Sequence, residues 1–83
     1  MAQWEKVRDR VLGGRSDANI PFQQLCNVLI RLDFSERITG SHHTFTRNDI
    51  PDIIVIQPSK GEATAKRYQV KQVRELLLKY NLR

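Results

Sequence analysis

Both histidines of this chain lie in one stretch, Gly40-Ser41-His42-His43-Thr44-Phe45-Thr46, which predicts a turn followed by a strand. A Gly-Ser pair is typical of a turn, and the alternating residues after it are typical of a strand. Successive side chains of a strand point to opposite faces, so a core-facing Phe45 directs His43 inward with it. His42 is then exposed on the open face. The alternative is that His42 is an ordinary surface histidine, since exposed histidines are common.

Apolar residues at helical spacing predict a helix on each side of this stretch. The first begins near Pro21, and its apolar face consists of Phe22, Leu25, Cys26, Leu29 and Leu32. The last runs roughly from Tyr68 to Tyr80, and its apolar face consists of Val70, Val73, Leu76, Leu77 and Tyr80. A further helix around Trp4 ends at Gly13-Gly14, and a polar linker over residues 15–19 follows it.

Three short strands are expected between the two longer helices. They cover residues 37–39, 42–47 and 53–56, with Pro51 marking a strand entry or an edge strand. The third strand is apolar on both faces, which requires a helix or a partner protein to cover the second face. A loop over residues 58–64 then leads to the last helix.

Length and charge limit the protein to a few classes. The chain has 83 residues, which predicts one domain with a modest core that gains from a partner or a homodimer. The net charge of +5 favours an anionic partner, with nucleic acid as the first candidate, although acidic residues are interleaved with the basic ones. We expect a cytoplasmic protein, because the chain has one cysteine, no apolar signal segment and no stretch long enough to cross a membrane.

No metal site or cofactor is expected from the sequence. His42 and His43 point apart on a strand, and the chain contains neither a Cys-x-x-Cys nor a His-Glu-x-x-His motif. Cys26 lies on the apolar face of a predicted helix and is expected to be a core residue.

The motif Gly40-Ser41-His42-His43-Thr44-Phe45, with an amphipathic helix before it and an apolar strand and the basic run 65–74 of the last helix and its approach after it, resembles the HicA toxin family. The resemblance covers residues 20–83 of a single domain, 1–83, in which residues 1–14 form an additional N-terminal helix. It implies an α+β, double-stranded-RNA-binding-domain-like fold, with a three-stranded antiparallel sheet packed by helices on one face. It also implies an endoribonuclease that cleaves mRNA and is held inactive by a HicB-type antitoxin from an adjacent gene.

The resemblance assigns the functional role to the first histidine after Gly-Ser, which is His42, in agreement with the alternation argument. Metal-free RNA cleavage needs a base, an acid and cations near the phosphate. We assign the proton transfer to His42, as either base or acid. The family's short form has Pro-x-His after the third strand, whereas residues 57–59 here are Gln-Pro-Ser. This departure favours a single-histidine mechanism.

A second departure is Asp33, which replaces the Gly that the family usually has after the first long helix. Because Asp adopts the left-handed conformation less readily than Gly, the geometry of this helix end is in question.

Several groups are expected to bind RNA phosphates. They are the backbone N–H groups of Gly40 and Ser41 and the side chains of Arg37, Arg47, Lys66, Arg67, Lys71 and Arg74. For the residues of the last helix, a solvated helix face is the alternative. An RNA-binding module without catalysis shares this fold and this basic face, and a DNA-binding module that uses Gln69 and Gln72 is a weaker alternative.

Overall fold

The computed structural model describes residues 3–58 and 63–82 and contains the predicted order of helices and strands. The elements are α1 (Gln3–Gly13), the 3₁₀ helix η1 (Asp17–Asn19), α2 (Phe22–Arg31), β1 (Ser35–Thr39), β2 (His42–Arg47), β3 (Ile50–Ile56) and α3 (Arg67–Lys79). The expected loop over 58–64 is described only at its two ends, because residues 59–62 lie outside the described part of the chain.

Two strands are longer than the sequence predicts. β1 begins at Ser35 instead of residue 37, and β3 begins at Ile50 instead of residue 53. Pro51 therefore lies within β3, where its missing N–H is tolerated because β3 is an edge strand. The linker expected over residues 15–19 also contains the short helix η1.

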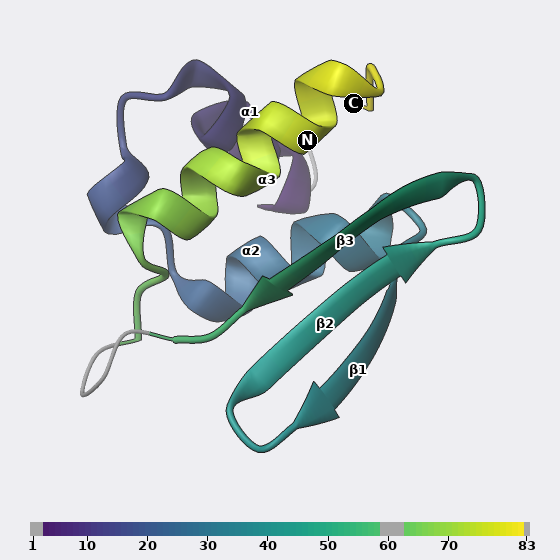
Figure 1. The fold of residues 1–83 in the computed structure, drawn as a ribbon. Helices are drawn as coiled ribbons and strands as arrows, with labels where there is room; N and C mark the ends of the chain where they lie inside the picture. The colour runs from purple at the N-terminus through teal and green to yellow at the C-terminus, as the bar shows by residue number, and fades with distance from the viewer. Residues whose placement is uncertain (1–2, 59–62, 83) are drawn as a thin grey trace.

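The sheet is antiparallel with the order β1-β2-β3, and its register determines which side chains meet the helices. Phe45 pairs with Ile54, and His43 pairs with Ile56. Phe45, Ile54 and Ile56 are buried, whereas Ile53 and Val55 of the same strand are 64% and 46% exposed. Figure 1 shows α2 and α3 on one face of the sheet. The opposite face, which we call the outer face, is not covered by a helix of the described chain.

The helices bury their apolar stripes against this sheet and against one another. The predicted faces of α2 and α3 are confirmed, because their apolar residues are buried, apart from Tyr80, which is partly buried. α1 adds Val7 and Val11 to the same core. Asp52 of β3 accepts hydrogen bonds from the Tyr80 hydroxyl at 2.8 Å and from Lys79 at 3.1 Å, which joins β3 to the end of α3.

The end of α2 has the left-handed geometry that the Asp33 departure had put in question. Asp33 has a φ of 72°, and its backbone N–H donates to the carbonyl oxygen of Ile30 at 3.0 Å. The N–H of Phe34 donates to the carbonyl oxygen of Leu29 at 3.1 Å. Since Asp is one of the few non-glycine residues that visit this conformation, the cap forms without glycine.

The fold is therefore α+β and double-stranded-RNA-binding-domain-like, with α1 as an additional N-terminal helix. Among the described residues, no helix is both long enough and apolar enough to span a lipid bilayer.

Candidate active site

His42 is the first residue of β2 and is exposed. It follows a turn in which Gly40 adopts a φ of 60°, a left-handed conformation that glycine enters without strain. A Cβ atom built on Gly40 would find no described heavy atom within 4 Å, so the space beside the turn is open. An imidazole, two backbone N–H groups and open space thus lie together at this corner of the sheet.

His43 has the inward orientation that the alternation predicts. Its Nδ1 lies 2.8 Å from a carboxylate oxygen of Glu36, and its ring packs edge-on against Phe22, with centroids 4.8 Å apart. The side chain is 13% exposed. These contacts tie β2 to β1 and α2, and they leave His42 as the accessible histidine.

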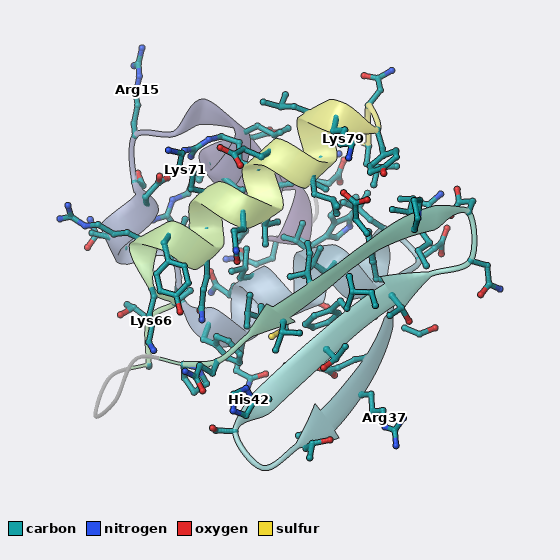
Figure 2. The ribbon with its side chains drawn as sticks, viewed as in Figure 1. Arg15, Arg37, His42, Lys66, Lys71 and Lys79 are labelled. Carbon is teal, nitrogen blue, oxygen red and sulfur yellow. The ribbon has the colours of Figure 1, made fainter. Side chains whose placement is uncertain are left out.

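The His42 corner is joined to the start of α3 by a short series of contacts. Ser41 Oγ donates to Gln57 Oε1 at 3.4 Å, just beyond the end of β3. The next residue, Pro58, forms a β-bridge with Ala65, and Lys66 follows directly. In Figure 2, His42 and Lys66 lie on the same side of the molecule, with Lys71 farther along α3. The structure therefore brings together the turn and the basic start of α3.

The outer face adds Arg37, which pairs with Thr44 in the β1–β2 register and is exposed. Figure 2 shows its side chain extending from β1 into solvent. Thr44 in turn pairs with Val55 of β3. One continuous surface thus includes His42, a cation and the two exposed apolar side chains of β3.

Two of the predicted phosphate-binding arginines have structural partners instead. Arg74 Nη1 lies 2.9 and 3.0 Å from the two carboxylate oxygens of Asp17, and it donates to the carbonyl oxygen of Val11 at 3.3 Å. Arg47 donates to the carbonyl oxygen of Leu32 at 2.9 Å and forms an ion pair with Asp49 at 2.8 Å. These pairings argue against phosphate binding by Arg74 and Arg47, because both guanidinium groups already hold segments of the fold together.

Three side chains that could bind a metal ion lie close together between α2 and the sheet, which the sequence had not suggested. The ligand atoms of Cys26, Glu36 and His43 all lie within 4.8 Å of one another. Burial, together with the smaller effect of the nearby Glu36 carboxylate, raises the pKa of the Cys26 thiol to about 12. A protonated thiol is a poor metal ligand. With His43 already bonded to Glu36, this group serves as polar packing in the arrangement observed.

Sequence reasoning missed Glu36 as the partner of His43. The hairpin register contains the signal, because Glu36 is opposite Phe45 and therefore diagonal to His43 on the same face. Gln57 was also missed as a partner of the turn, since its contact with Ser41 depends on the β2–β3 register.

An exposed histidine at a strand start, on the same side of a double-stranded-RNA-binding-domain-like fold as the basic start of α3, is an arrangement expected of a protein that acts on RNA. The family described as the HicA toxin of bacterial toxin–antitoxin systems matches residues 22–79, and the chain belongs to this family. The protein is therefore the toxin component of a toxin–antitoxin system. Neither the curated proteins nor the solved structures gave a match to the chain.

Proposed function

We propose that this toxin is an endoribonuclease that cleaves mRNA, with His42 as its proton-transfer group. The observation that carries the proposal is the contrast between the two histidines, because His42 is exposed beside the Gly40-Ser41 turn while His43 is packed against Phe22. A proton-transfer group must reach the substrate, and histidine exchanges protons near neutral pH.

The chemistry follows from the groups at this corner. As a base, His42 would take the proton of a ribose 2′-hydroxyl, whose oxygen then attacks the adjacent phosphorus. As an acid, it would protonate the leaving 5′-oxygen. Charge develops on the phosphate oxygens in either case, and the N–H groups of Gly40 and Ser41 and the ammonium group of Lys66 are the proposed stabilising donors.

The direct test compares His42→Ala with Thr46→Ala, a control on the same strand at another exposed position. We expect His42→Ala to lower the rate of RNA cleavage by about 10²-fold or more while the protein remains folded. Induction of this variant should no longer arrest growth. Thr46→Ala should behave as the wild type. Full toxicity of the His42 variant would exclude the assignment.

The same variant separates catalysis from simple binding. If the domain is a non-catalytic RNA-binding module, the wild type binds RNA without cleaving it, and His42→Ala arrests growth as the wild type does. The pH dependence of the cleavage rate then identifies the direction of proton transfer. A rate that rises as histidine deprotonates indicates a base, and a rate that falls indicates an acid.

We also propose that a HicB-type antitoxin from the adjacent gene inhibits the toxin by covering the outer face. Ile53 and Val55 are 64% and 46% exposed beside the strand that begins with His42, and exposed apolar surface of this kind marks an interaction site. An acidic partner would suit the basic toxin and repel RNA.

Diethyl pyrocarbonate modification, assigned to individual residues by fragmenting the peptide in the mass spectrometer, tests this arrangement. His42 should react in the free toxin and be protected in the complex. His43 provides an internal control, because it is 13% exposed and should react slowly in both states. A complex in which His42 stays as reactive as in the free toxin would exclude inhibition by burial of the site.

A further inference from the structure

A pocket of about 630 Å³ lies between the linker after α1 and the first turns of α3. Its lining includes Arg15, Asp17, Asn19, Arg67, Tyr68 and Lys71. One wall, residues 14–19, precedes the segment 22–79 that matches the HicA family. The segment before residue 22 therefore builds one wall of a pocket that the matched segment does not form by itself.

The side chains that line the pocket carry a net positive charge. Asp17, the acidic group among the described lining residues, is neutralised by Arg74, whose Nη1 contacts both carboxylate oxygens at 2.9 and 3.0 Å. Arg67 and Lys71 are four residues apart on α3, so their side chains project from the same face of the helix. Arg15 extends into solvent from the linker in Figure 2, where it adds long-range attraction for an anion.

The linker wall is held in place before any ligand arrives. Arg10 donates to the carbonyl oxygen of Asn19 at 3.0 Å, and Arg74 donates to the carbonyl oxygen of Val11 at 3.3 Å. Gly14 has a φ of 72°, and a Cβ atom on it would come within 3.3 Å of the Arg74 guanidinium. A preformed wall lowers the ordering cost of binding.

The pocket also has an aromatic wall. Tyr68 is 56% exposed, and its hydroxyl accepts a hydrogen bond from Gln69 Nε2 at 3.4 Å. Tyr80, by contrast, packs against the core and donates its hydroxyl proton to Asp52. An exposed ring beside two cations matches the base and the phosphate of a nucleotide.

We propose that this pocket binds one nucleotide of a single-stranded RNA that continues to His42, with Arg67 and Lys71 on its phosphate and its base stacked on Tyr68. The inference rests on the proposed function, because it assumes that the RNA also occupies the His42 corner. Lys66 directly follows the Pro58–Ala65 bridge and lies between the start of α3 and His42 in Figure 2. The N-terminal segment thereby extends the RNA-binding surface beyond the site of cleavage.

The test uses 2′-O-methyl oligouridylates of two to eight nucleotides, which lack the attacking hydroxyl and are not cleaved. Fluorescence anisotropy of the wild type should show a step in affinity once the oligonucleotide is long enough to reach the pocket. Tyr68→Ala should lower the affinity of the longer oligonucleotides about tenfold and leave dinucleotide affinity unchanged. Lys71→Ala should reduce the salt slope by about 0.7.

Lys6→Ala is the matched control, because Lys6 is also an exposed helical lysine but does not line the pocket. It should keep the length-dependent step. A step of the same size in Lys71→Ala and Tyr68→Ala as in the wild type would overturn the pocket while leaving RNA cleavage by His42 unaffected. If the wild-type protein shows the length-dependent step in affinity but does not cleave RNA, the pocket is supported and the catalytic proposal is rejected.

Discussion

Replacement of the two adjacent histidines by alanine should have opposite consequences for stability and activity. His43→Ala removes a side chain that is 13% exposed, packs edge-on against Phe22 at 4.8 Å and bonds Glu36 at 2.8 Å. An edge-to-face pair contributes about 1 kcal/mol beyond burial, and a hydrogen bond contributes about 1 kcal/mol net. These two contributions alone amount to about 2 kcal/mol, or roughly 8–16 °C in Tm for a domain of this size.

His42→Ala should change the free energy of unfolding by less than about 0.5 kcal/mol, because the side chain is exposed. Urea denaturation followed by circular dichroism measures both variants. The His43→Phe variant separates the ring contact from the hydrogen bond, since it keeps a ring against Phe22 and loses the bond to Glu36. About half of the loss in unfolding free energy seen in His43→Ala should therefore remain. Equal destabilisation by His42→Ala and His43→Ala would refute the opposite orientations of the two side chains.

Three further predictions concern Asp52, Cys26 and metal ions. The hydrogen bonds from Tyr80 and Lys79 lower the pKa of Asp52, so this carboxylate stabilises the fold above its unfolded pKa of about 3.9 and loses that effect as the pH falls through the lower folded value. Asp52→Asn should therefore melt below the wild type at pH 7, with the gap closing toward pH 3. Burial raises the pKa of the Cys26 thiol to about 12, and iodoacetamide at pH 8 should leave the native protein unmodified but alkylate it fully in denaturant. RNA cleavage should persist in excess EDTA, and a loss that zinc restores would instead implicate Cys26 and its neighbours Glu36 and His43.

Local patterns in the sequence were sufficient to predict the three α-helices, β2 and the orientations of the two histidines. Alternation in a strand is a property of the backbone, so the inward direction of Phe45 determined that of His43. The apolar stripes of α2 and α3 were likewise readable from helical spacing. The first residues of β1 and β3 were missed because Ser35 and Pro51 are weak strand signals, and pairing with β2 decides their conformation.

What only the tertiary structure decided is which cations are available to a ligand. Sequence places Lys71 and Arg74 together on one basic helix, yet Arg74 is bonded to Asp17, 57 positions earlier, while Lys71 lines an open pocket. The same applies to Arg47, whose partner is the carbonyl oxygen of Leu32 at the end of α2. Spacing along a chain reports local geometry, whereas the partner of a long flexible side chain depends on which distant segment packing brings within its reach.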